Sequence, residues 1–310
     1  MQPVGIMNKA AVIGLGTMGP GIAATLARAG VNVSAFDADA AKRAKAPQGF
    51  AAAATVLSAL GVADRTVGAI AVHDSLAACV VGVDLVIETV PEDLDLKIQV
   101  FREIEAHVTD ECILASDTSG IPITRIAAGT RIPSRVVGMH WSNPPHIIPM
   151  IEVIGGEQTA PAVVIRVVEL VRRTGHLPVT IRKDVPGFVE NRVLYAIMRE
   201  CLDLVEQGVI EPQDLDACVS WGIGYKLAGV GPMALLDMAG LDIYSAVGSY
   251  LNKELSNRRD VAAYIAERTS QGKLGIKSGG GIYEYTAEKI AELQSARARK
   301  LVAVRKALQA

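Results

Sequence analysis

The sequence predicts an α/β protein in which a doubly wound parallel sheet is followed by an all-α C-terminal domain. Three features of the 310-residue chain indicate this fold class. Short β-branched runs alternate with helical stretches up to residue 184, a glycine-rich turn joins the first run to the first helix, and long amphipathic stretches follow from residue 185. The length also suits two domains of ordinary size.

The first predicted elements surround the glycine-rich turn. Lys9–Ile13 is short, apolar and β-branched, which is typical of a buried strand, and it leads directly into the turn. Pro20–Ala29 has helical composition and is followed by Gly30, a residue type that often ends helices. Val31–Phe36 alternates in hydrophobicity as a strand does, and it ends at Asp37.

Further apolar runs of strand length continue the alternation. The charged, periodic stretch Asp95–His107 predicts a helix between two of them. Because strands that alternate with helices form parallel sheets, we expect one sheet with helices on both faces. The strands expected in it are Leu85–Ile87, Ile113–Ala115, Val136–Met139 and Met150–Ile154.

The character of the chain changes near Lys183–Gly187. Before this point runs of β-branched residues dominate, and after it long amphipathic stretches do. We therefore predict a first domain over residues 1–184 and a helical second domain over 185–310, which closes the substrate cleft and forms a homodimer contact. Its helical stretches include Phe188–Gln207, Leu235–Leu251 and Thr286–Ala310.

Composition excludes several classes of protein. A net charge of −2 and an aromatic content of 4% argue against a nucleic-acid-binding surface. No apolar run reaches the ~18 residues of a membrane-spanning helix. The cysteines form no CxxC pair, which argues against a zinc site or a disulfide framework. We expect a cytoplasmic protein without a metal site.

The turn itself predicts a dinucleotide site. It reads Gly-Leu-Gly-Thr-Met-Gly, and it has the strand before it and the helix after it that a Rossmann-type domain requires. The first glycine allows the tight turn, the second lets a pyrophosphate approach the backbone, and the third lets helix and strand pack closely. We expect the cofactor to contact Gly14, Gly16, Thr17, Met18 and Gly19.

Asp37 selects between the two nicotinamide cofactors. It stands at the end of the second predicted strand, where a carboxylate can accept hydrogen bonds from both ribose hydroxyls. The same negative charge would repel a 2′-phosphate. The sequence therefore predicts NAD, rather than NADP, as the cofactor.

A histidine and a glutamate fall on neighbouring predicted strands. His140 stands at the carboxyl end of the run that begins at Val136, the edge at which open α/β sheets bind ligands. Glu152 is flanked by apolar residues, so we expect it to be buried and to need a partner. A buried acid paired with a histidine would orient the ring and stabilise its protonated form.

The chain resembles the NAD-dependent L-3-hydroxyacyl-CoA dehydrogenases from Ala11 to about Tyr285. The resemblance is specific because many motifs match in the same order. These motifs are Gly14–Ala23, Glu88–Leu94, Ser116–Gly120, Gly138–Pro144, Met150–Ile154, Pro186–Arg192 and Gly275–Tyr283.

The resemblance implies roles for matching residues. His140 corresponds to the general base that removes a hydroxyl proton while hydride passes to NAD, and Glu152 to its orienting carboxylate. Ser119 and Asn191 correspond to polar groups that hold the reacting oxygen; helix capping or turn chemistry is the alternative for both. The positions at which the family contacts its cofactor or closes over it are Glu92, Lys97, Asn143 and Lys277.

Three features indicate a branch of the family that acts on small free acids. The acyl-CoA enzymes carry a lysine-rich helical arm after the second strand, whereas here Phe50–Val72 contains Arg65 as its only cation. The double proline of Ser142–Pro149 is also similar to that branch. Lys226 stands where that branch places a cation, so it either binds a substrate carboxylate or is an ordinary surface lysine.

We therefore predict NAD-dependent oxidation of a small alcohol or hydrated aldehyde that bears a carboxylate. A dehydrogenase of fatty-acid oxidation that acts on L-3-hydroxyacyl-CoA is one alternative. A β-hydroxyacid dehydrogenase is disfavoured by the His140–Glu152 pair, since those enzymes use a catalytic lysine. A non-catalytic, crystallin-like NAD-binding protein is disfavoured because it has no need for a buried acid such as Glu152.

Overall fold

The computed structural model describes residues 6–62 and 67–309, and it divides into two compact units after Asn191. The predicted boundary after residue 184 lies inside the first unit, and it stays a prediction. Arg65 lies outside the described residues. Within the described ranges, no helix has the length and apolar character needed to cross a membrane.

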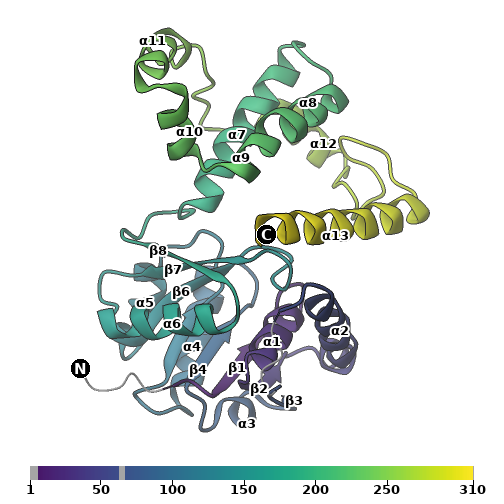
Figure 1. Ribbon diagram of the computed structural model, residues 1–310. Coiled ribbons are helices and arrows are strands. Elements are labelled where there is room, and N and C mark those ends of the chain that lie inside the picture. The colour runs from purple at the N-terminus through teal and green to yellow at the C-terminus, as the bar shows by residue number, and fades with distance from the viewer. Residues whose placement is uncertain (1–5, 63–66, 310) are drawn as a thin grey trace. The chain divides into compact units, whose positions relative to one another are not determined.

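The first unit is built on one eight-stranded sheet with the order β3-β2-β1-β4-β5-β6-β7-β8 (Figure 1). Its first six strands follow the order of a doubly wound dinucleotide-binding domain. The predicted Rossmann-type fold is therefore confirmed. The strands are β1 (Lys9–Ile13), β2 (Asn32–Phe36), β3 (Ile70–Val72), β4 (Leu85–Glu88), β5 (Ile113–Ser116), β6 (Val136–Trp141), β7 (Met150–Gly155) and β8 (Leu177–Ile181).

The last two strands, β7 and β8, correct the expectation of a wholly parallel sheet, because both run opposite to the first six. β7 runs antiparallel to β6, while the other neighbouring pairs are parallel. The physical reason is the connection Ser142–Pro149, which contains no helix and is too short for a crossover between parallel strands. The antiparallel register sets His140 directly opposite Glu152.

Helices cover both faces of the sheet, as the alternation predicts (Figure 1). Side chains of α1 (Gly19–Arg28), α2 (Ala40–Ala59) and α6 (Pro161–Arg173) belong to the hydrophobic cluster on one face. The other face carries a second cluster, to which α3 (Leu76–Val80), α4 (Leu94–Glu105) and α5 (Ile123–Ala127) contribute.

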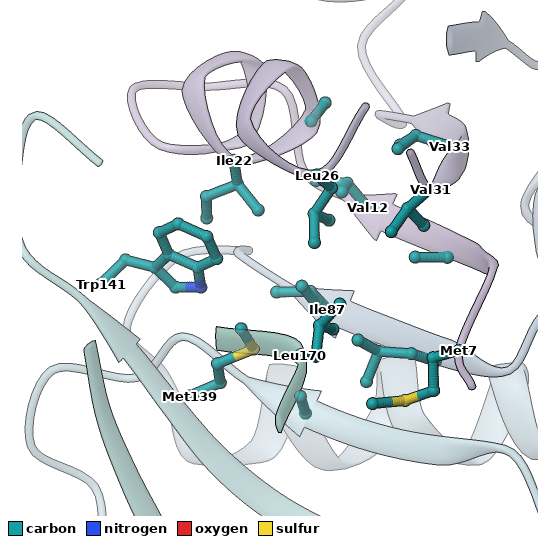
Figure 2. Close-up of a cluster of buried hydrophobic side chains, with 14 of the residues drawn as sticks. Met7, Val12, Ile22, Leu26, Val31, Val33, Ile87, Met139, Trp141 and Leu170 are labelled. Carbon is teal, nitrogen blue, oxygen red and sulfur yellow. The ribbon is translucent and has the colours of Figure 1, made fainter. Parts of the chain in front are cut away.

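Figure 2 shows the first of these clusters, in which Ile22 and Leu26 of α1 meet Val12 and Ile87 of the sheet. All four side chains are fully buried. Complete burial of one such side chain stabilises a fold by about 1.5–3 kcal/mol. Trp141, at the end of β6, borders the same cluster, so the strand that carries His140 is anchored in the core.

The second unit is helical, as predicted. The amphipathic stretch Leu235–Leu251 is not one helix, because it breaks at Gly240, whose φ of 98° suits glycine and strains other residues. Its helices are α7 (Glu190–Glu206, which begins in the first unit), α8 (Pro212–Cys218), the π-helix Val219–Gly224, α9 (Tyr225–Gly229), α10 (Pro232–Ala239), α11 (Leu241–Leu251), α12 (Ala263–Ser270) and α13 (Ala287–Gln309).

Gly19 provides a stability test of the glycine turn. A Cβ on Gly19 would lie 2.0 Å from the carbonyl oxygen of Gly14, so the backbone would have to move. Although alanine favours helices over glycine, we expect Gly19→Ala to lower the free energy of unfolding by about 2–3 kcal/mol. Gly16→Ala is the matched control, because its Cβ would meet no atom within 4 Å. Equal urea midpoints for the two variants would contradict this account of the turn.

Candidate active site

The glycine turn presents free backbone donors at the start of α1. Gly14 has a φ of 103°, and its N–H donates to the carbonyl oxygen of Phe36 at 2.8 Å. Gly16 and Thr17 are exposed. Within the described ranges, the N–H groups of Gly16, Thr17 and Met18 have no protein acceptor. Together with the open space beside Gly16, these donors fit a pyrophosphate.

Asp37 is fixed beside this turn. One carboxylate oxygen accepts the Leu15 N–H at 2.8 Å, and the other accepts the Asp39 N–H at 2.9 Å. The side chain is nearly buried, and the Lys42 ammonium lies 3.7 Å from it. The carboxylate thus stands at the carboxyl end of β2 in an orientation set by the backbone, which suits the adenosine ribose of NAD.

Lys97 is held by carboxylates inside the protein. Its ammonium lies 2.8 Å from an oxygen of Glu88 and 3.4 Å from an oxygen of Glu92, and the side chain is 1% exposed. Burial raises the pKa of Glu88, and Lys97 partly opposes this effect. The structure therefore shows Lys97 as a partner of two acids, and the cofactor contact expected for it stays a prediction.

Glu92 organises the turn that carries Ser119. One of its carboxylate oxygens accepts the hydroxyl of Thr118 at 2.6 Å, the N–H of Ser119 at 3.0 Å and the N–H of Gly120 at 3.1 Å. Its other oxygen faces Lys97. This network ties α4 to the loop after β5 and fixes the backbone at Ser119.

His140 and Glu152 form a buried pair. Nδ1 of His140 lies 2.8 Å from a carboxylate oxygen of Glu152, with the histidine 5% and the glutamate 1% exposed. Burial lowers the pKa of His140, but the bond to Glu152 and nearby negative charges such as those of Glu152 and Glu190 outweigh it, so the pKa is raised overall. The ring is thereby oriented and made a stronger base.

A strained turn directs two further donors at Glu152. Gly187 and Phe188 have φ values of 76° and 48°, and left-handed backbone at a non-glycine residue costs about 1–3 kcal/mol. The turn aims the N–H groups of Val189 and Glu190 at the second oxygen of Glu152, at 3.0 and 3.1 Å. Burial raises the pKa of Glu152, yet the His140 bond and these donors lower it overall.

Ser119 and Asn191 lie together. The side-chain amide of Asn191 donates to the carbonyl oxygen of Ser119 at 2.6 Å, and the N–H of Gly187 donates to the carbonyl oxygen of Gly120 at 3.1 Å. Ser119 is exposed and Asn191 is partly exposed. The loop after β5 is therefore joined to the start of α7, although the roles of the two side chains stay predictions.

The remaining expected residues lie on the surface. Asn143 is an exposed residue in the β6–β7 connection. Lys226, in α9 of the second unit, is exposed as well. Lys277 lines a cavity of about 380 Å³ in the second unit, together with Arg268 and Lys273, so the lining carries positive charge.

Two acidic residues near the pair had no role in the sequence prediction. Glu190 accepts a hydrogen bond from the hydroxyl of Ser142. Asp117 is buried and accepts the N–H of Trp141 at 2.8 Å. An acid directly after an apolar strand was the available signal for Asp117, whereas nothing local identified Glu190.

A cation would find three ligand atoms near this pair. One atom each of His140, Glu152 and Glu190 lie within 4.8 Å of one another. The Glu152 oxygens already serve the His140 ring and two backbone donors, so the arrangement is accounted for by hydrogen bonding alone. A metal-free site stays the prediction.

Comparison with known proteins gives the same family and the same fold. Residues 9–185 match the NAD-binding domain of 3-hydroxyacyl-CoA dehydrogenase, and residues 187–285 match its C-terminal domain. A 5-formyl-3-hydroxy-2-methylpyridine 4-carboxylate 5-dehydrogenase from Mesorhizobium japonicum is 58% identical over 98% of this chain and 99% of its own. The sequence alone predicts a close similarity to this dehydrogenase, and the comparison confirms it. The runs that predict it are Asp117–Thr124, His140–Ile154 and Ser220–Lys226.

Solved structures show the same fold and the same family. The crystal structure of a 5-formyl-3-hydroxy-2-methylpyridine 4-carboxylic acid 5-dehydrogenase, described as an NAD⁺-dependent dismutase, has a TM-score of 0.96 and 57% identity over 98% of this chain and 99% of that one. An (S)-3-hydroxybutyryl-CoA dehydrogenase from Ralstonia eutropha has a TM-score of 0.72 and 31% identity, over 90% and 99%. This chain therefore belongs to the 3-hydroxyacyl-CoA dehydrogenase family and is an NAD-dependent dehydrogenase.

Proposed function

We propose that the protein oxidises a small alcohol or hydrated aldehyde that bears a carboxylate, with 5-formyl-3-hydroxy-2-methylpyridine 4-carboxylate as the leading candidate substrate. The observation that carries the chemistry is the buried His140–Glu152 pair at the carboxyl edge of the sheet. The substrate class is supported by 58% identity, over nearly the whole chain, to a dehydrogenase named for that pyridine aldehyde.

The pair suits general-base catalysis. Because Nδ1 of His140 donates to Glu152, the other ring nitrogen, Nε2, is left to accept a proton. A hydrated aldehyde presents a hydroxyl proton to Nε2, and Glu152 then stabilises the imidazolium. Bound NAD supplies the hydride acceptor. Ser119 and Asn191 hold the reacting oxygen in this proposal, and their contact with each other keeps the two groups in one place.

A substrate comparison tests this function. NADH formation would be followed with the pyridine aldehyde, with free 3-hydroxy acids and with 3-hydroxyacyl-CoA thioesters. We expect the highest kcat/KM for a free carboxylate-bearing substrate, because Phe50–Val72 has a single cation in its sequence with which to hold a coenzyme A phosphate. A higher kcat/KM for the thioesters would establish the alternative, a dehydrogenase of fatty-acid oxidation.

Asp37 should determine cofactor choice. We expect Asp37→Asn to weaken NAD binding about tenfold, or about 1.4 kcal/mol, and to narrow the preference for NAD over NADP. Asparagine keeps one acceptor, for the Leu15 N–H of the turn, while the N–H of the exposed Asp39 loses its acceptor and can turn to water. Asp39→Asn, which removes an exposed charge two positions away, is the matched control. Calorimetry gives both affinities, and unchanged values for Asp37→Asn would contradict the ribose contact.

Lys226 is proposed to bind the substrate carboxylate. We expect Lys226→Met to raise KM about tenfold for carboxylate substrates while NAD affinity stays unchanged, because one charge-assisted contact is lost. Lys253→Met, which changes another exposed lysine of the second unit, is the control. If both variants keep the wild-type KM, Lys226 is an ordinary surface lysine.

We further propose a cytoplasmic homodimer. Helices α7 to α12 contain no buried residue within the chain, and they expose large apolar side chains such as Trp221 (77%), Met238 (73%) and Tyr225 (71%). Exposed apolar surface of this kind marks protein interfaces, which supports the dimer. The cytoplasmic location is supported separately by the four cysteines, which are all free, as suits a reducing compartment. Light scattering measures the mass, and a monomer would contradict the dimer.

A further inference from the structure

Asp117 joins the end of β5 to the strand that carries His140. It directly follows β5, and its N–H donates to the carbonyl oxygen of Glu88 at 2.9 Å, which continues the sheet by one residue. One side-chain oxygen accepts the N–H of Trp141 at 2.8 Å. Trp141 is the residue after His140, so the Asp117 carboxyl fixes the backbone beside the proposed base.

This carboxyl group is buried without a cation bonded to it. Asp117 is 9% exposed. The charged groups that face it are Glu88 from β4, Lys97 from α4 and His140 from β6. Lys97 is already bonded to Glu88 at 2.8 Å and lies 3.4 Å from Glu92, and no ion pair joins it to Asp117 in the described part of the chain.

These surroundings favour the neutral acid. Moving a carboxylate out of water is costly unless a charge partner compensates for it. Burial raises the pKa of Asp117 to about 8, although the Trp141 N–H and the charges of His140 and Lys97 act in the opposite direction. The Trp141 bond needs only an acceptor oxygen, which a neutral carboxyl group also offers.

We propose that Asp117 is a positioning residue that keeps its proton at neutral pH. When Asp117 loses that proton, its negative charge makes His140 bind its own proton more tightly. The first half of this proposal stands independently of the reaction. The second half rests on the proposed function, in which His140 is the base.

The sign of the coupling follows from the charges. A negative Asp117 stabilises the imidazolium of His140 and therefore raises the pKa of His140. While Asp117 is neutral, this contribution is absent, and His140 releases its proton at a lower pH. Loss of the Asp117 proton above about pH 8 would then add an ionisation on the alkaline side of the pH profile.

Intrinsic fluorescence tests the first half without any substrate. The chain has two tryptophans, Trp141 and Trp221, so Trp221→Phe leaves Trp141, whose backbone N–H contacts Asp117, as the sole tryptophan. Emission would be followed across about pH 6 to 10, with Trp221→Phe/Asp117→Asn as the matched protein. His176, whose ring lies 5.4 Å from that of Trp141, is present in both proteins, so any effect that it has on the emission is common to both curves.

We expect a transition near pH 8 in the Trp221→Phe protein, and we expect it to be missing when Asp117 is asparagine. The same curve in both proteins, or no transition in either, would overturn the proposal. Because this measurement needs no turnover, it decides the protonation of Asp117 even if the proposed function fails.

The pH dependence of kcat/KM tests the second half. Below pH 7, Asp117→Asn should keep activity within about threefold of wild type, because asparagine preserves the acceptor for Trp141 and mimics the neutral acid. Its profile should lack the alkaline ionisation. Asp117→Ala, which removes the acceptor, should lose more activity at every pH. The coupling would be overturned if the pH profile of Asp117→Asn superposed on that of the wild type. It would also be overturned if Asp117→Asn lost activity at every pH while its NAD affinity stayed normal.

Discussion

Replacement of His140 by glutamine is expected to lower kcat about 10³-fold while NAD affinity stays within about twofold of wild type. Glutamine can still reach Glu152 with a donor, but it has no basic nitrogen to accept a substrate proton. Steady-state NADH formation and calorimetry with NAD measure the two effects separately.

His107→Gln is the control for this variant. His107 is an exposed residue of the same unit, after α4, and no carboxylate is bonded to it in the described part of the chain. It should keep the wild-type kcat. If His140→Gln also kept it on the best substrate found, the assignment of His140 as the base would be wrong.

The second large effect concerns Glu152, whose replacement by glutamine should lower kcat by about 10²-fold or more. A neutral amide no longer stabilises the imidazolium, and its NH₂ group can donate to Nδ1 and so favour the wrong tautomer of His140. Glu157→Gln, an exposed glutamate just after β7, is the matched control and should behave as wild type.

The same variant has a predicted pH signature. In the wild type, burial lowers the pKa of His140, while Glu152 and its neighbours raise it overall. The base is active when it is neutral, so removal of the Glu152 charge should move the acid limb of the kcat/KM profile to lower pH. A limb that stays in place, or that moves to higher pH, would contradict the coupling between the two side chains.

Much of the fold could be predicted because its signals are local. Lys9–Ile13, the glycine turn and Asp37 are contiguous, and each has one physical interpretation. The direction of β7 depended on the absence of a helix from a short loop, which hydrophobic alternation does not reveal. β3 was missed because it has only three residues, and β8 contains a proline at position 178.

The sequence indicated which residue types the candidate site contains, but it did not indicate which of them touch one another. The alternation of strands placed His140 at the carboxyl edge of the sheet and Glu152 inside the next strand, but their 2.8 Å contact depends on an antiparallel register that only the folded chain displays. The left-handed turn at Phe188 and the partners of Lys97 are long-range features as well. No periodicity in the sequence encodes such contacts.

The central claim is that hydride passes directly from the substrate carbon to NAD at a site served by His140. The pyridine aldehyde, deuterated at its formyl carbon, would be incubated with NAD and the wild-type enzyme, and the nucleotide product analysed by mass spectrometry. We predict NADH that carries the deuterium, and almost none from His140→Gln in the same time. NADH that contains only protium, or equal labelled product from both proteins, would contradict the account.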